Sequence, residues 1–198
     1  MRDIAAQFKE LRLNGMAGAW VELTTAEGQS SDVGIQTSRW LIEHLLQAEH
    51  AQRAFASVRH QMKAAKFPLH RDRAGFDFEA SKIDHKLVKQ LSTLEFTETA
   101  QNVVLIGGPG TGKTHLATAI GVAGIAAKGK RVRFYSTVDL VNELEKEKRE
   151  GKAGRIALAL SRLDLVILDE LGYLPFSQAG GALLFHLLSK LYEHTSVV

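Results

Sequence analysis

Apolar positions recur at helical spacing through the first part of the chain. They predict one amphipathic helix that begins near residue 4 and a second, longer helix over residues 40–67, separated by a Ser- and Gly-rich linker over residues 29–36. Pro68 is expected to end the second helix, because proline disfavours helical geometry in the preceding residue and lacks a backbone donor. Residues 1–75 are therefore predicted to form a small all-helical domain. The first helix is begun by Ile4, Phe8, Leu11 and Leu13.

Short apolar runs alternate with helical patterns in the rest of the chain. This alternation is typical of a parallel sheet covered by helices on both faces, with ligands at the carboxyl ends of the strands. We therefore predict a three-layer α/β domain over residues 76–198. The predicted strands are 103–106, 131–135 and 163–170, and the predicted helices are 87–96, 113–127, 136–149 and 156–162.

The first predicted strand leads directly into the spacing of a phosphate-binding loop, Gly107-x-x-x-x-Gly112-Lys113-Thr114. Glycines let the backbone curl until successive N–H groups point at one anion. Lys113 can then hold the β- and γ-phosphates and Thr114 can ligate Mg²⁺, while the following helix offers its positive N-terminal end. A ligand-free glycine-rich turn is disfavoured by the apolar strand in front. The residues expected to contact ATP are Gly107, Gly108, Pro109, Gly110, Thr111, Gly112, Lys113, Thr114 and His115.

A second motif consists of a buried-type β run that ends in two acids, Asp169 and Glu170. Asp169 is expected to hold the Mg²⁺ shell. Glu170, as the next residue, points the other way off the strand end and can polarise a water for in-line attack on the γ-phosphate. With Lys113 as the other catalytic residue, the pair predicts hydrolysis rather than transfer to a hydroxyl. An isolated Asp-Glu would be a solvated turn, but here it follows a phosphate-binding loop.

Aromatic and histidine side chains near these motifs have two interpretations. Phe76 and Phe78 could stack on an adenine ring, although anchoring of the linker is the favoured role. His115 and Tyr173 flank the two motifs, where packing is the default. His115 is also not spaced with other ligands as a metal site requires.

Composition excludes several classes of protein. No stretch reaches the roughly 18 apolar residues of a membrane span, and the charged start lacks the apolar core of a signal peptide. We therefore expect a cytoplasmic location and no membrane partner. The absence of cysteine excludes disulfides and Cys-ligated zinc. A net charge of +3 does not alone indicate nucleic acid.

The distribution of charge is more informative, because no acid occurs between Glu49 and Asp72. On the second helix a basic stripe runs beside an apolar face. A solvated face and a phosphate-contacting face explain this stripe equally well. The cations over residues 146–155 are interleaved with glutamates, which favours a salt-bridged exposed helix over DNA contact. The apolar face consists of Phe55, Val58, Met62 and Ala65, and the stripe of Arg59, Lys63 and Lys66.

Several of these stretches together resemble the IstB-like transposition helper ATPases. The resemblance runs over nearly the whole chain. Its motifs are Gly-Gly-Pro-Gly-Thr-Gly-Lys-Thr-His-Leu-Ala at 107–117, Arg-Val-Arg-Phe at 131–134, Asp-Leu-Val at 139–141 and Leu-Asp-Glu-Leu-Gly-Tyr at 168–173, with 11–16, 63–68 and 76–78 matching the helical N-terminal region.

The resemblance implies an AAA+ fold, ATP-dependent assembly on duplex DNA, and delivery of a partner transposase to its target in bacterial mobile elements. Bacterial helicase-loader ATPases share most of these motifs, and the N-terminal match favours transposition over replication. A module that binds nucleotide without turnover is the alternative from a different class.

One departure concerns residues 195–198, where the next strand of the AAA+ core begins. The C-terminal part of that core, with its sensor residue and arginine finger, is expected to be missing, so the finger should come from a neighbouring full-length subunit of a homo-oligomer. In the resembling fold the next strand lies between the two motif-bearing strands. Apolar edges and unpaired backbone are therefore expected there, with weak solubility or dependence on neighbouring chains.

Overall fold

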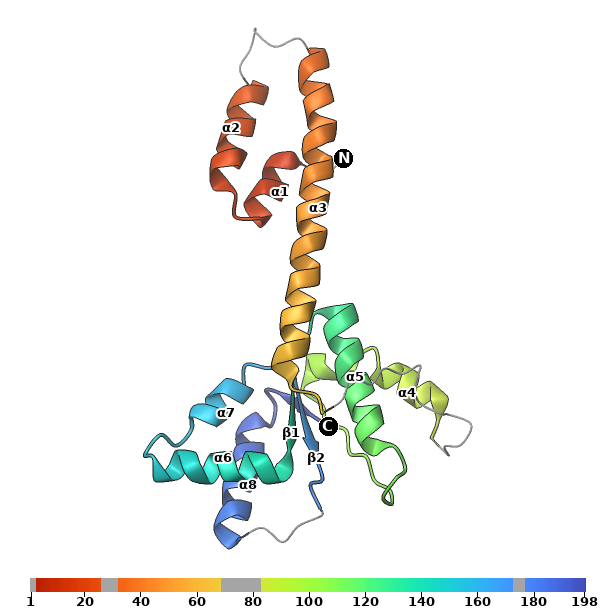
Figure 1. Ribbon diagram of the computed structural model, residues 1–198, viewed down its shortest axis with the longest axis vertical. Helices are drawn as coiled ribbons and strands as arrows, with labels where there is room; N and C mark the ends of the chain where they lie inside the picture. Colours follow the sequence, from red (N-terminus) through yellow and green to blue (C-terminus); the bar gives the residue numbers. More distant parts are fainter. Residues whose placement is uncertain (1–2, 26–31, 69–82, 173–176) are drawn as a thin grey trace. The chain divides into compact units, whose positions relative to one another are not determined.

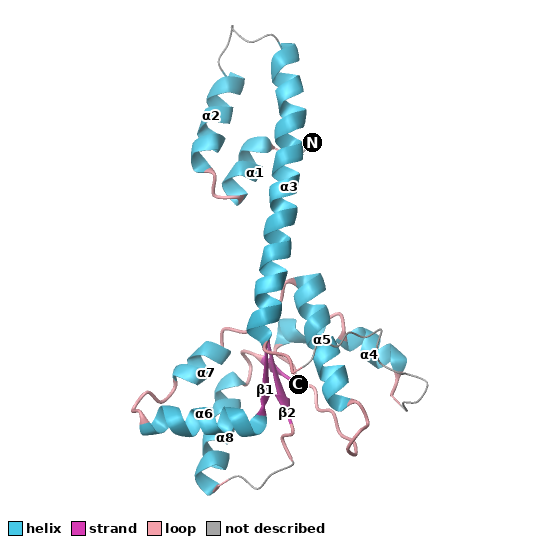
Figure 2. Cartoon of the chain, viewed as in Figure 1, coloured by secondary structure: helices cyan, strands magenta, loops and turns pink. Residues whose placement is uncertain are grey.

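The computed structural model describes residues 3–25, 32–68, 83–172 and 177–198 (Figures 1 and 2). They form two compact units, Met1–Ser57 and Val58–Val198, and the boundary between the units falls inside one helix. The domain boundary at residue 75 lies outside the described residues and stays a prediction. No helix in the described part is long and apolar enough to cross a membrane. The elements are α1 (Ile4–Glu10), α2 (Asn14–Thr25), α3 (Asp32–Ala65), α4 (His85–Leu91), η2 (Glu95–Thr99), α5 (Lys113–Lys128), β1 (Val132–Ser136), α6 (Thr137–Arg149), α7 (Arg155–Leu160), β2 (Leu165–Asp169), α8 (Gln178–Leu191) and β3 (Ser196–Val197).

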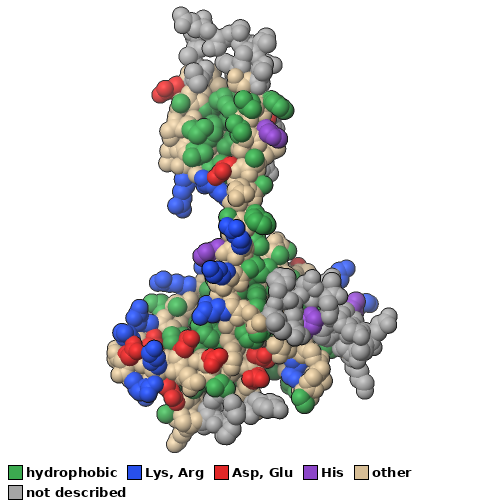
Figure 3. Space-filling view, in the orientation of Figure 1, with side chains coloured by type: hydrophobic (Ala, Val, Ile, Leu, Met, Phe, Trp, Pro, Cys, Tyr) green, Lys and Arg blue, Asp and Glu red, His purple; other side chains and the backbone are tan. Residues whose placement is uncertain are grey.

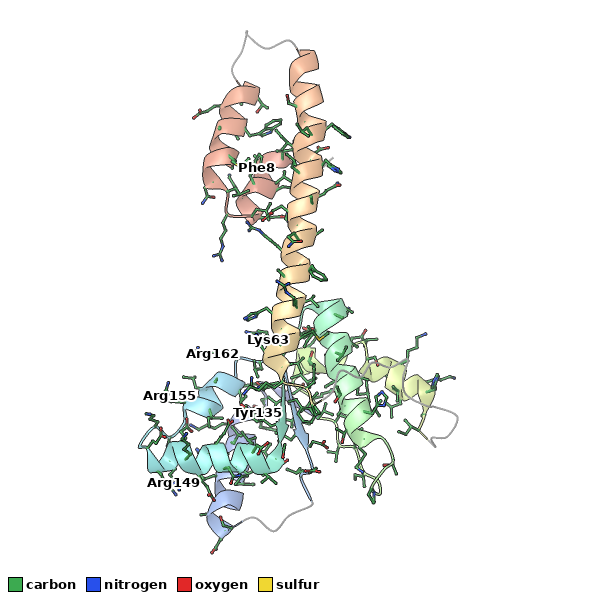
Figure 4. The ribbon with its side chains drawn as sticks, viewed as in Figure 1. Phe8, Lys63, Tyr135, Arg149, Arg155 and Arg162 are labelled. Carbon is green, nitrogen blue, oxygen red and sulfur yellow. The ribbon has the colours of Figure 1, made fainter. Side chains whose placement is uncertain are left out.

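The first unit is helical, as predicted, but its helices differ from the prediction. The Asp3 carboxylate accepts a hydrogen bond from the N–H of Ala5 at 3.0 Å and starts α1. The single helix predicted from residue 4 is wrong, because the chain turns between α1 and α2, where Arg12 has a φ of 58°. The linker was predicted to extend to residue 36, but α3 already begins at Asp32. The core of this unit contains Ile4, Phe8 (Figure 4), Leu11, Ala17 and Leu46.

The second unit contains the parallel sheet. β2 lies between β1 and β3, and Leu165 of β2 pairs with Val132 on one side and Ser196 on the other. Alternate residues of β2 enter two different cores: Ile167 packs with α5, whereas Val166 packs with α6, α7 and α8. Figure 1 shows α5 on one side of the strands and α6 and α8 on the other. The predicted three-layer α/β architecture is therefore confirmed.

The last turns of α3 are fixed to this second unit. Ala65 is fully buried in its core, and Val58 and Met62 pack against it. Phe55 was predicted on the same face, but it is 65% exposed. The guanidinium of Arg133 in β1 donates to the carbonyl of Ala64 at 2.7 Å, and the amide of Gln61 donates to the carbonyl of Gly129 at 3.1 Å. The helix ends at Ala65, two residues before the predicted end at residue 67, and the next residue, Lys66, has a left-handed φ of 55°.

The strand predicted over residues 103–106 does not form. Val103 N–H donates to the carbonyl of Val197 at 2.9 Å, which places β3 between this segment and β2. Because β3 is only two residues long, the rest of the segment has no neighbouring strand among the described residues. Val104 and Ile106 are 76% and 92% exposed, as expected for an apolar edge. A cavity of about 1040 Å³ lies here, lined by this segment, the end of β2 and side chains of α8.

The glycines of α5 and α8 give a matched test of packing. Gly124 in α5 lies against the fully buried Leu94, and a Cβ on Gly124 would overlap the Leu94 side chain. We expect Gly124→Ala to lower the free energy of unfolding by about 1–3 kcal/mol, the usual effect of overpacking. Gly181 in α8 has no atom near its Cβ position, so Gly181→Ala should raise stability by up to about 1 kcal/mol. Urea unfolding midpoints measure both, and shifts in the same direction would contradict this packing.

Candidate nucleotide site

The glycine-rich loop turns directly into α5. Gly110 and Gly112 have φ values of 75° and 84°, a left-handed conformation that glycine adopts without steric cost. Gly112 caps α5, and its carbonyl accepts the first helical hydrogen bond, from Leu116 N–H at 2.9 Å. The N–H groups of the first helical turn have no acceptor within the helix, so they are available to a ligand bound at the loop. Loop and helix together offer backbone donors and a positive helix end to an anion.

Lys113 folds back over this loop. Its ammonium donates to the carbonyls of Gly107 and Gly108, at 2.8 and 2.7 Å. The Thr111 hydroxyl donates to the Gly108 carbonyl as well, at 2.9 Å. Because these groups are at most half-buried, the ammonium can exchange the carbonyls for phosphate oxygens without unfolding the loop.

The two sequence motifs meet at Thr114 and Asp169. The Thr114 hydroxyl donates to Asp169 Oδ2 at 2.8 Å, although the residues are 55 positions apart. Mg²⁺ prefers oxygen ligands at 2.0–2.1 Å in an octahedron, whose edge is then about 2.9 Å. Two oxygens held 2.8 Å apart therefore fit adjacent positions around this ion. The described residues contain no group of three or more His, Asp or Glu side chains that could hold a metal, so the protein's ligands here would be Thr114 and Asp169.

The tip of β2 is fixed by a residue that sequence reasoning missed. The hydroxyl of Thr137, at the start of α6, donates to the Asp169 carbonyl at 2.6 Å and is fully buried. This bond ties the end of the acid-bearing strand to the neighbouring strand–helix turn. The signal was available in part, because Ser136 and Thr137 follow a predicted strand and would lie at the same sheet edge as Asp169.

Glu170 has an unusual backbone conformation. Its φ of 64° is left-handed, which costs a residue with a side chain about 1–2 kcal/mol. Its N–H donates to Asp169 Oδ1 at 3.1 Å, and its carboxylate has no hydrogen-bond partner among the described residues. Glu170 is exposed and lines the same cavity as Lys113 and Asp169. Strained backbone of this kind concentrates at functional sites.

The remaining predicted residues are placed less closely. His115 is half-buried in the first turn of α5, and Pro109 is exposed in the loop. Phe76, Phe78 and Tyr173 lie outside the described residues. The structure thus brings together Gly107, Lys113, Thr114, Asp169 and Glu170 at the carboxyl end of the sheet.

Comparison with known proteins gives a match over most of the chain. The family described as IstB-like ATP binding protein matches residues 6–198. A Pseudomonas aeruginosa protein named as an ATP-binding protein of insertion sequence IS21 is 40% identical over 77% of this chain and 58% of its own length. A Geobacillus stearothermophilus protein named in the same way for insertion sequence IS5376 is 32% identical over 95% of this chain and 73% of its own length. The chain thus spans less than two thirds of the first relative.

Solved structures give the same fold. The DnaC helicase loader has a TM-score of 0.52 and 25% sequence identity, with 57% of this chain and 64% of that chain covered. DnaA from Aquifex aeolicus, with AMPPCP bound, has a TM-score of 0.54 and 24% identity, with 66% of this chain and 41% of that chain covered. The likeness to both confirms an α/β fold of the AAA+ type.

Proposed function

Because this chain belongs to the IstB-like ATP-binding protein family, we propose that it binds and hydrolyses ATP with Mg²⁺ and uses this cycle to assemble on duplex DNA and deliver a transposase. The relatives named for insertion sequences support a role in DNA recombination of bacterial mobile elements. The observation that carries the ATPase proposal is the Thr114–Asp169 hydrogen bond, which joins the two motifs. We place this activity in the bacterial cytoplasm.

Each site residue has one role in the proposed reaction. The loop N–H groups and Lys113 would hold the phosphates, while Thr114 and Asp169 would hold Mg²⁺, which would supply positive charge near the γ-phosphate. Glu170 accepts a proton from the attacking water. The water oxygen bonds to the γ-phosphorus as the bond to the bridging oxygen of ADP breaks, so that ADP and phosphate are released.

Turnover in this proposal depends on assembly. An arginine finger from a neighbouring subunit would stabilise the charge of the transition state, and such a group contributes about 10³-fold or more in rate. The exposed apolar edge at Val104 and Ile106 supports the proposal that this chain depends on neighbouring chains. The chain is thus proposed to act in a homo-oligomer.

Two alternatives differ in what they predict. A helicase-loader-like role in replication is supported by the DnaC fold, but that likeness covers 57% of the chain, whereas the IS5376 relative covers 95%. A nucleotide-binding module without turnover is supported by the open edge beside the site. It predicts ATP binding with no phosphate release.

The decisive experiment is steady-state ATP turnover of this chain with and without duplex DNA. Turnover that rises with DNA is expected for the proposed function. Bound ATP without turnover under both conditions would support the binding module, and failure to bind ATP would reject both.

The proposed Mg²⁺ ligand can be tested separately. We expect Asp169→Asn to lower ATP affinity in Mg²⁺ by about tenfold or more, because one charged ligand near the phosphates is lost. In EDTA the wild type and the variant should bind ATP alike. Asp139→Asn, at an exposed aspartate in the first turn of α6, is the matched control and should change neither value. An unaltered Mg²⁺ dependence in Asp169→Asn would remove Asp169 from the metal site.

A further inference from the structure

One edge of the second unit carries a group of exposed cations, which we call the basic face. Arg59 and Lys63 lie four residues apart in the last turns of α3, and Lys66 directly follows the end of α3 at Ala65. Arg162 joins them from the turn before β2. Figure 4 labels Lys63 and Arg162, and Figure 3 shows Lys and Arg side chains over this part of α3. The basic face consists of Arg59, Lys63, Lys66 and Arg162, all of them exposed.

Hydrogen bonds connect the segments that carry the two parts of the basic face. Gln61 of α3 bonds to Gly129, just before β1. Two residues later, Arg131 N–H donates to Asp164 Oδ2 at 2.7 Å, and Asp164 N–H donates back to the Arg131 carbonyl at 3.0 Å. Because Arg162 precedes Asp164 by two residues, it lies at the same end of the sheet as the end of α3. This is the end opposite the phosphate-binding loop.

The charges of the basic face are not compensated within the described residues. None of its four cations has an ion pair or hydrogen bond there. Neighbouring Arg131 differs, because it pairs with Asp164 at 3.1 Å. Burial raises the pKa of the Asp164 carboxyl, but the hydrogen bonds and charge of Arg131 outweigh burial and hold this pKa below its ordinary value. Arg131 is therefore neutralised, whereas the basic face presents net positive charge.

The basic face is also held rigidly, and its centre carries no cluster of exposed apolar side chains. Ala65 is buried on the adjoining face of α3, and the Arg133–Ala64 bond holds the last turn. Within residues 58–68, all of which are described, no large apolar side chain is exposed; Phe55 and Leu158, four residues before Arg59 and Arg162, are exposed singly. Protein interfaces centre on buried aromatic or aliphatic anchors, so this surface fits a polyanion better than a protein partner.

We infer that the basic face contacts the phosphate backbone of duplex DNA. This inference rests on the proposed function, in which the chain assembles on duplex DNA. It identifies the surface that contacts the DNA. Seven residues of helix extend about 10 Å, and duplex DNA carries one charge per about 1.7 Å of its axis, so several phosphates can face this stripe. The contact reads no base sequence, which suits a protein that assembles along DNA.

The test compares two triple variants with equal loss of charge. One carries Arg59→Gln, Lys63→Gln and Lys66→Gln; the control carries Lys146→Gln, Lys148→Gln and Arg149→Gln on α6, where glutamates are interleaved. Affinity for a fluorescent duplex of random sequence is measured by anisotropy at several salt concentrations with ATP present. We plot the logarithm of the binding constant against the logarithm of the salt concentration. The magnitude of this slope should be smaller in the first variant than in the wild type by up to about 2.7, which is about 0.9 per lost phosphate contact. The control should keep the wild-type slope.

Each outcome separates this inference from the proposed function. If the wild type binds ATP but no duplex, the DNA part of the proposed function fails. If the wild type binds duplex and the α3 variant keeps its slope, the basic face is rejected while the proposed function stands. Loss of binding in the α6 variant instead would place the contact on α6. Unchanged ATP affinity and thermal unfolding in both variants would show that the fold is intact. The single variant Arg162→Gln should lower the magnitude of the salt slope by about 0.9.

Discussion

Glu170→Gln is expected to lower ATP turnover by at least about 100-fold while ATP affinity changes by less than about threefold. The amide keeps the size and shape of the carboxylate but cannot accept a proton from the attacking water. General-base catalysis contributes about 10²–10⁴ in rate, which sets the expected loss. Affinity should persist because the phosphates are held by Lys113 and the loop.

The conformation of Glu170 makes the choice of control important. Its left-handed φ of 64° is shared by Glu193, which has a φ of 65° and is also exposed. Glu193→Gln therefore changes charge in the same backbone setting but away from Lys113 and Asp169. Phosphate release and nucleotide binding are measured for both variants with duplex DNA present.

The results of this pair separate the two classes of function. Loss of turnover in Glu170→Gln alone supports hydrolysis by water activation. If both variants release phosphate at the wild-type rate, Glu170 is not the base. If the wild type also shows no turnover, the chain is a nucleotide-binding module.

The site was predictable where a short motif determines local geometry. The glycines of 107–112 and the acids after an apolar run are local signals, and parallel strands bring their carboxyl ends together. The predicted meeting of Thr114 and Asp169 at one sheet edge is therefore seen, at 2.8 Å. The Thr137 bond was missed because a buried hydroxyl that supports a strand tip has no motif of its own.

The fold was less predictable where tertiary pairing decides. Residues 103–106 have strong β propensity, but a strand also needs a partner, and only Val103 has one. Helix α8 was not predicted, although Ser177 accepts from Gly180 N–H at 2.9 Å as its N-cap. The leucines of α8 at 184, 187 and 191 are buried at helical spacing and carried the usable signal. The break between α1 and α2 depends on one left-handed residue, Arg12, which periodicity does not reveal.

The second large effect is expected at Lys113. We expect Lys113→Ala to weaken ATP binding by at least about 100-fold, because two charge-assisted hydrogen bonds to phosphate are lost at about 1.5–3 kcal/mol each. Among the described residues, the ammonium bonds to the carbonyls of Gly107 and Gly108, both of them exposed residues. Water replaces these bonds in the variant, so the free energy of unfolding should change by less than about 1 kcal/mol.

Lys128→Ala is the matched control, because Lys128 ends the same helix that Lys113 begins. It lies about 22 Å farther along α5, at 1.5 Å per residue, and carries the same charge. Calorimetric titration with ATP, together with urea unfolding, measures binding and stability for both variants. A loss of binding confined to Lys113→Ala, at unchanged stability, means that the lysine acts on the nucleotide and not on the loop. Equal ATP affinity in the two variants would instead mean that the loop N–H groups and the helix end hold the phosphates without help from the lysine.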